Sequence, residues 1–232
     1  FPFVKGKGRL FFKERAAGIG LRRFRQKHIA ITGAPCYNRL EKSQICEVSP
    51  MKYKKVLLLK NGVECCLRNG MESDGQAVLD NVRLTHGETD YLLTYPDENS
   101  FDAMQESQFL KEKTESKDEV EIVAIVDHAV VGTAGLEAVG KKYKVRHRAE
   151  LGISVAKEFW GLGIGQALTA ACMECAKAAG YIQLELSVAA GNERALAMYK
   201  KAGFVEYGRN PKGFRSRWTG FQEVVYMRLE LE

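Results

Sequence analysis

The sequence predicts a single domain of mixed α/β class over residues 51–232, built on a sheet that holds both antiparallel and parallel strands. Three observations predict this class. A hairpin signal opens the domain, short alternating apolar runs recur along it, and two amphipathic helical patterns lie between strands in its second half. Hairpins followed by strand–helix–strand units are typical of a mixed sheet with helices packed on it.

The first predicted element is a β-hairpin. Residues 55–60 and 63–68 are strand-like, and Asn61-Gly62 between them tolerates the positive φ angles of a tight turn. Three apolar residues at helical spacing then predict a helix, and a more polar helix is predicted after it. The first helix is expected at residues 76–85 and the second at residues 101–113. A charged loop is expected at residues 112–119.

Strands dominate the rest of the chain. They are predicted at residues 120–127, 129–136, 149–155, 182–188, 204–208 and 223–231. A long helix over residues 164–179 carries an apolar stripe and ends at Gly180, and a shorter helix over residues 194–202 follows a cap at Asn192. Residues 141–148 are expected to be a basic loop or the start of a strand, and residues 210–220 a loop.

The positive charge of the chain lies in its first fifty residues. These hold 11 Lys/Arg against 3 Asp/Glu, whereas the remainder holds 24 against 26. Residues 1–50 show no sustained periodicity, and we expect them to be a basic N-terminal extension, disordered or non-native, ahead of the domain at 51–232. The basic run at residues 22–28 leaves two interpretations open, a solvated extension and a nucleic-acid-binding arm.

Several classes of protein are excluded or disfavoured. No apolar run approaches the ~18 residues of a membrane span, and no signal-peptide pattern opens the chain. Six cysteines are present, and Cys172 and Cys175 have the spacing of half a metal site. Both lie within the helical stripe and no second pair accompanies them, so we expect buried core residues, no metal, and a cytoplasmic protein.

The most informative segment is the glycine-rich turn from Trp160 to Gln166. It lies between a predicted strand and a predicted helix, so several backbone N–H groups are bare at the positive end of a helix, which suits phosphate. The spacing does not fit a dinucleotide fingerprint, because Gln166 or Leu168 stands at its last position. A second glycine motif ends in Gly140-Lys141, but Lys142 stands where a P-loop needs Ser or Thr.

The turn resembles the signature of the GNAT superfamily of acetyl-coenzyme-A-dependent N-acetyltransferases, Gln/Arg-x-x-Gly-x-Gly/Ala. Trp160, Gly163 and Gly165 occupy the three signature positions, and the tryptophan is a departure because it carries no cation or amide. The resemblance extends over residues 55–232 and includes Leu151-Gly-Ile-Ser-Val, Asn192 and Met198-Tyr199-Lys-Lys-Ala-Gly-Phe204. Within the superfamily the sequence most resembles the bacterial branch that is similar to ribosomal-protein N-acetyltransferases.

The resemblance implies a GNAT-like fold, with a central, mostly antiparallel sheet that contains a splayed pair of parallel strands, flanked by helices. It implies acetyl-CoA as co-substrate, with the diphosphate on the turn and the pantetheine arm along the strand before it. The expected coenzyme-binding residues are Ile153, Ser154, Val155, Gly161, Leu162, Gly163, Ile164, Gly165, Gln166 and Asn192. Tyr199 occupies the position of the general acid, and Glu150 is the expected general base, with Glu185 as its competitor.

The resulting hypothesis is direct transfer of an acetyl group to a primary amine in a ternary complex. Two alternatives stay open: an acyl-CoA-binding regulatory domain, and a nucleic-acid-binding protein that acts through residues 1–50. The acceptor is a small-molecule amine or the N-terminus or lysine of a protein, selected by residues 85–98, 141–148 and 210–220. No membrane partner is expected, and a homodimer is an open expectation from the family.

Overall fold

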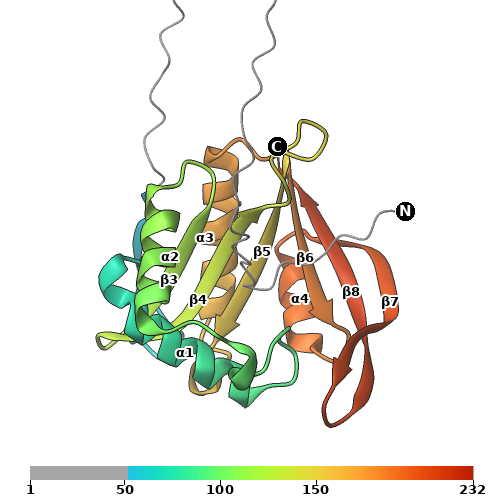
Figure 1. The fold of residues 1–232 in the computed structure, drawn as a ribbon, viewed down its shortest axis with the longest axis horizontal. Helices are drawn as coiled ribbons and strands as arrows, with labels where there is room; N and C mark the ends of the chain where they lie inside the picture. Colours follow the sequence, from blue (N-terminus) through green and yellow to red (C-terminus); the bar gives the residue numbers. More distant parts are fainter. Residues whose placement is uncertain (1–51, 232) are drawn as a thin grey trace, which may run out of the picture. The chain divides into compact units, whose positions relative to one another are not determined.

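The computed structural model describes residues 52–231, which belong to one compact unit. Their strands form a single eight-stranded sheet in the order β1-β2-β3-β4-β5-β6-β8-β7 (Figure 1). The strands are β1 Lys54–Leu58, β2 Glu64–Asn69, β3 Val120–Val126, β4 Ala129–Ala138, β5 Arg148–Val155, β6 Gln183–Ala189, β7 Val205–Ser216 and β8 Gly220–Glu230. The α-helices are α1 Gly75–Glu88, α2 Ala103–Glu115, α3 Ile164–Ala178 and α4 Glu193–Lys201.

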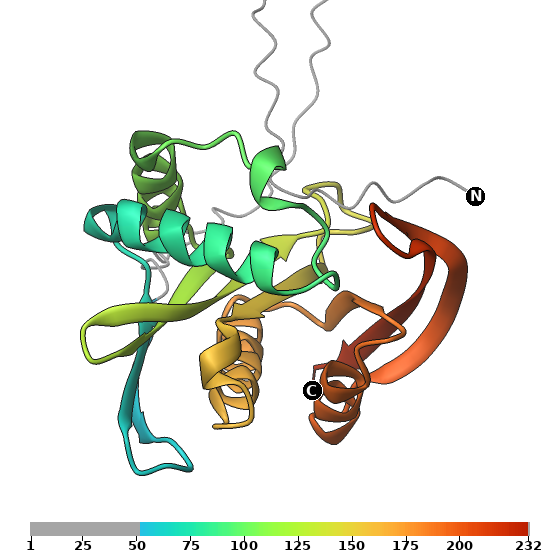
Figure 2. The same cartoon turned by 90° about the horizontal axis from the view of Figure 1, so that it is seen from below.

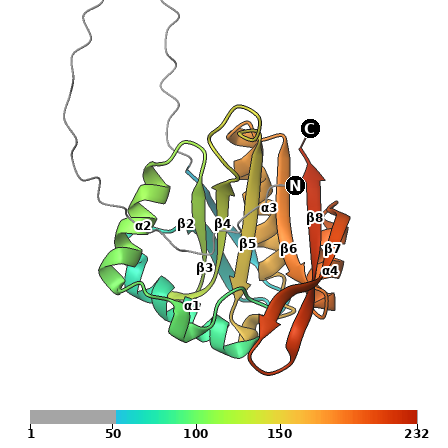
Figure 3. The same ribbon diagram turned by 45° about the vertical axis from the view of Figure 1, so that its right-hand side comes forward.

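The sheet is antiparallel except where β5 and β6 lie side by side. These two strands are parallel and share three partner rows, which end at Glu150 and Glu185. Beyond that row β5 stays paired with β4 and β6 stays paired with β8, so the two strands separate (Figure 3). The predicted mixed sheet with a splayed parallel pair is therefore confirmed.

Helices cover both faces of the sheet (Figure 2). On one face α1 and α2 enclose a small core with Val123 of β3, and on the other α3 and α4 enclose the larger core. The apolar stripe predicted on α3 is buried there, because Leu168, Cys172 and Cys175 are at most 5% exposed. The two cysteines serve as core side chains, and the residues from 52 to 231 contain no cluster of three or more metal-ligating side chains.

The hairpin at the start of the domain is confirmed, since Gly62 between β1 and β2 has a φ of +81°. Two predicted loops are wrong in part. Helix α2 continues to Glu115, into the charged stretch expected to be a loop from residue 112. Residues 210–220 are also mostly strand, because β7 runs to Ser216 and pairs with β8 up to Gly220.

The error in β7 has a local cause. Pro211 and Gly213 are typical loop residues, but they fall in a register shift between Asn210 and Phe214, where an irregular strand accommodates them. A Cβ on Gly213 would lie 2.6 Å from Val224 of β8, so only glycine allows this close approach. The segment expected to be a loop is thus the end of β7, the turn after it and the first residue of β8.

The prediction for residues 1–50 lies outside the described residues, so the nucleic-acid interpretation of that segment stays a prediction. Within residues 52–231, every helix is too short or too polar to span a bilayer.

Candidate functional site

The turn between β5 and α3 has the conformation of an anion cradle. Gly161 and Gly163 have φ values of +83° and +105°, which side chains rarely adopt, and a Cβ on either would point into open space. Gly163 caps α3 without a side-chain hydrogen bond, and no acidic residue lies in the first turn. The first N–H groups of α3 therefore have no side-chain acceptor and face no competing carboxylate.

Trp160, at the start of this turn, makes one hydrogen bond and one cation–π contact. Its indole N–H donates to the backbone carbonyl of Val155 at 2.7 Å. The guanidinium of Arg194, from the first turn of α4, lies 5.3 Å from the centre of its indole ring. Sequence reasoning missed Arg194, because only the packing of α4 against the turn brings it to Trp160.

The peptide groups of β5 alternate between its two neighbours. Ala156 N–H donates to Val131 at the end of β4, so the groups of Ser154 also face β4, whereas those of Ile153 and Val155 face the splay. The carbonyl of Val155 accepts the hydrogen bond from Trp160. The N–H of Val155 and the N–H and carbonyl of Ile153 are therefore the main-chain groups that face the splay without a partner strand. The structure thus places Ile153 and Val155 at the splay, and directs Ser154 away from it.

Asn192 and Tyr199 lie at the two ends of α4. The Asn192 side chain accepts a hydrogen bond from Ala195 N–H at 3.2 Å, so the predicted cap is present. Tyr199 is 6% exposed, and its ring packs edge-on against Phe204 with centroids 5.6 Å apart. Burial, followed by the nearby thiol of Cys172, raises the pKa of Tyr199, which keeps its hydroxyl protonated.

The two carboxylates considered as bases differ sharply in their surroundings. Glu185 is 7% exposed and forms a bidentate ion pair with Arg148, whose Nη2 donates to its Oε2 at 2.6 Å. Glu150, directly opposite on β5, has no hydrogen bond or ion pair among the described residues. Burial raises the pKa of Glu150, and the charges of Glu185 and Glu137 raise it further.

The sheet is open beside Glu150 on the side away from α3. Gly152 lies two residues further along β5, on the same face, and it is exposed. A Cβ added to Gly152 would meet no atom within 4 Å. Free space therefore adjoins the unpaired carboxylate of Glu150, and a substrate can approach it from this face.

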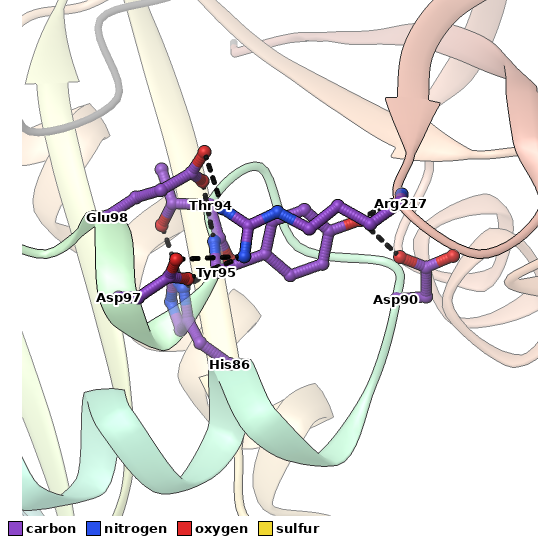
Figure 4. Close-up of polar contacts among 7 residues, drawn as sticks. All are labelled: His86, Asp90, Thr94, Tyr95, Asp97, Glu98 and Arg217. Carbon is purple, nitrogen blue, oxygen red and sulfur yellow. Dashed lines mark hydrogen bonds and ion pairs between the residues drawn. The ribbon is translucent and has the colours of Figure 1, made fainter.

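The loop that follows α1 is tied to the β7–β8 hairpin (Figure 4). The Tyr95 hydroxyl donates to Asp90 at 2.9 Å and accepts from Arg217 N–H at 2.9 Å. The Arg217 guanidinium lies 4.2 Å from the centre of the Tyr95 ring and pairs with Asp97 at 2.8 Å. The loop and hairpin enclose a pocket of about 180 Å³ lined by Asp90, Leu92, Leu93, Tyr95, Gly213, Phe214, Arg215, Ser216 and Gln222.

Comparison with known proteins assigns the family. A profile of the Acetyltransferase (GNAT) family matches residues 86–204. Over 94 residues the chain is 35% identical to YdaF of Bacillus subtilis, whose name assigns it provisionally as a ribosomal N-acetyltransferase. This match covers 38% of the chain and about half (49%) of the relative.

Solved structures show the same fold. A GNAT acetyltransferase from Streptococcus pneumoniae matches with a TM-score of 0.69 and 24% identity, over 72% of this chain and 99% of that one. A ribosomal-protein-alanine N-acetyltransferase from Brucella melitensis gives 0.63 and 25%, over 71% and 99%. A phosphinothricin acetyltransferase from Sinorhizobium meliloti, solved with acetyl-CoA, gives 0.63 and 18%, over 75% and 89%. The chain is a member of the GNAT family of acetyltransferases.

Proposed function

We propose that the protein transfers an acetyl group from acetyl-CoA to a primary amine in a ternary complex. The observation that carries the proposal is the continuity of two features, the bare amides at the start of α3 and the unpaired edges of β5 and β6. A diphosphate fits the first and an extended amide-bearing arm fits the second, and coenzyme A joins both.

The residues at the turn and the splay fit this co-substrate. The peptide N–H groups from Gly161 to Gln166, including those of Leu162, Ile164 and Gly165, would hold the diphosphate. Ile153 and Val155 would pair with the pantetheine arm. Ser154 contributes no main-chain contact in this proposal, and Asn192 has a free amide group that can reach the arm.

Glu150 is the proposed general base. An amine with a pKa of roughly 10.4 is protonated near neutrality and must lose a proton before attack. A carboxylate whose pKa is raised by burial is a better acceptor for that proton, and Glu150 adjoins free space beside Gly152. We assign Glu185 to structure instead, because Arg148 holds its carboxylate in a bidentate ion pair.

Tyr199 is the proposed general acid. Glu150 takes one proton from the ammonium group, and the neutral amine nitrogen then bonds to the acyl carbon. The carbon–sulfur bond breaks, the Tyr199 hydroxyl gives its proton to the departing thiolate, and the second proton of the nitrogen leaves to solvent, as does the proton held by Glu150. That hydroxyl makes no hydrogen bond among the described residues, so it is free to face the sulfur. Solvent then returns a proton to Tyr199.

The acceptor remains open between a small amine and a protein amine. The names of YdaF and of the Brucella relative make a protein N-terminus the first acceptor to test. We keep the cytoplasm as the proposed location, since the described cysteines, at 65, 66, 172 and 175, are all free thiols.

The test is a turnover assay with acetyl-CoA against a panel of peptide N-termini, lysine peptides, polyamines and small amines. Release of CoA thiol that depends on one acceptor supports an acetyltransferase. Tight CoA binding without turnover of any acceptor would favour the regulatory alternative. If the chain neither binds CoA nor turns over acetyl-CoA, both the acetyltransferase and the regulatory interpretation are refuted.

A further inference from the structure

We infer that Arg194, which lies over the Trp160 ring, supplies the positive charge at the phosphate end of the site and makes it selective for a phosphate-bearing thioester donor. The inference rests on the proposed use of acetyl-CoA and names a residue that determines the choice of donor. It starts from a departure in this chain, since the signature position that carries Gln or Arg in the family is occupied by Trp160.

Two contacts place one face of α4 directly against the glycine turn. The Arg194 guanidinium lies 5.3 Å from the Trp160 ring centre, and a Cβ added to Gly165 would lie 3.2 Å from the sulfur of Met198. Arg194 and Met198 are four residues apart, so they project from the same face of the helix. The position of Arg194 next to the turn is thus fixed by packing at both ends of one helical turn.

The Trp160 ring contacts one side of the Arg194 guanidinium and restricts its movement. Its indole N–H is bonded to the carbonyl of Val155, so the ring cannot rotate freely. A guanidinium held over an aromatic face by its charge uses no N–H group for a hydrogen bond to the ring plane's edge, so its N–H groups remain available to a ligand. The ring therefore holds Arg194 beside the turn, next to the position that carries Gln or Arg in the family signature.

The charge of Arg194 is also uncommitted. Arg194 is exposed and forms no ion pair among the described residues. By contrast, Arg148, Arg209 and Arg217 are each paired with a carboxylate. A planar donor without an acidic partner, beside bare helix N–H groups, fits a phosphate ester with two oxygens available for bidentate contact. The ligand class is therefore a nucleotide-bearing thioester rather than the thioester arm alone.

The experiment compares acetyl-CoA with acetyl-pantetheine, which has the same thioester and arm but no phosphate. Both donors are assayed with the wild-type chain, Arg194→Gln and Arg194→Lys, and CoA binding is measured by calorimetry. Arg83→Gln is the matched control, because Arg83 is an exposed arginine on α1 without an ion pair among the described residues. Loss of a charge-assisted contact predicts a KM for acetyl-CoA and a Kd for CoA about 10- to 100-fold higher in Arg194→Gln.

The two donors separate a binding role from a structural one. With acetyl-pantetheine, the KM of Arg194→Gln should stay within about twofold of the wild-type KM. With acetyl-CoA, the kcat of Arg194→Gln should change little, and Arg194→Lys should recover part of the affinity for CoA. Unchanged CoA affinity in Arg194→Gln would overturn the inference, as would an equal loss with both donors. If CoA binds but no amine is acetylated, the proposed function fails, and the Kd values still decide the role of Arg194.

Discussion

Replacement of Glu150 by glutamine tests the proposed chemistry most sharply. Glutamine keeps the shape of the side chain but cannot accept the proton of an ammonium group. For a lysine or polyamine acceptor with a pKa of roughly 10.4, about one amine in a thousand is neutral at pH 7.4, so loss of the base should lower kcat with such an acceptor roughly 10²- to 10³-fold. The KM for acetyl-CoA should change little, because Glu150 lies outside the turn that would hold the diphosphate.

The assay is the initial rate of thiol release against pH. In the wild-type chain the acidic limb of kcat/KM should lie above the ordinary pKa of glutamate, because burial and two carboxylates raise the pKa of Glu150. Glu150→Gln should remove that limb and become faster as pH rises through the pKa of the free amine. An unchanged limb in Glu150→Gln would refute the assignment of the base.

Stability provides an internal control for the same variant. A carboxyl group whose pKa is raised in the folded state stabilises the fold fully only below its unfolded pKa, and that contribution is lost as pH rises through the folded pKa. At pH 7 the ionised Glu150 is therefore less favourable than a neutral isostere. The free energy of unfolding of Glu150→Gln should equal or exceed that of wild type, so a loss of activity cannot be ascribed to unfolding.

Three further substitutions distinguish the roles of the other residues. Tyr199→Phe should lower kcat about 10²-fold or more while calorimetry finds CoA affinity within about twofold, and an unchanged kcat would remove Tyr199 as the acid. Gly152→Leu should raise the acceptor KM about tenfold and leave the melting temperature unchanged, because its Cβ meets open space, and an unaffected KM would place the acceptor elsewhere. Glu185→Gln should lower the unfolding free energy by about 1–3 kcal/mol in denaturant titration, since Arg148 loses its partner, whereas a stable but inactive variant would make Glu185 the base.

Local patterns predicted much of the fold correctly. The turn at Asn61-Gly62 could be predicted from those two residues alone. The buried stripe on α3 could be predicted from the spacing of its apolar residues. The strand β7 could not be predicted in the same way, because Pro211 and Gly213 favour a loop locally. Only pairing with β8 at a register shift makes them part of a strand.

The candidate site shows the same division. The sequence predicts Gly161 and Gly163 as binding residues because glycines would act through their own backbone, and both have the positive φ that favours glycine. The choice between Glu150 and Glu185 needed the position of Arg148, and Arg194 needed the packing of α4 on Trp160. The sequence alone does not tell which neighbouring strand the peptide groups of Ser154 face, and the structure shows that they face β4.

The central claim is that the bare amides of the β5–α3 turn bind the diphosphate of coenzyme A, and a calorimetric titration of CoA tests it directly. Gly161→Val and Gly180→Val are a matched pair, since both glycines have φ near +80° and open space at Cβ, but Gly180 lies at the far end of α3. We predict binding to wild type and to Gly180→Val, and affinity reduced about tenfold or more in Gly161→Val as its amides are displaced. Absence of CoA binding to wild type, or equal affinity in both variants, would contradict the account.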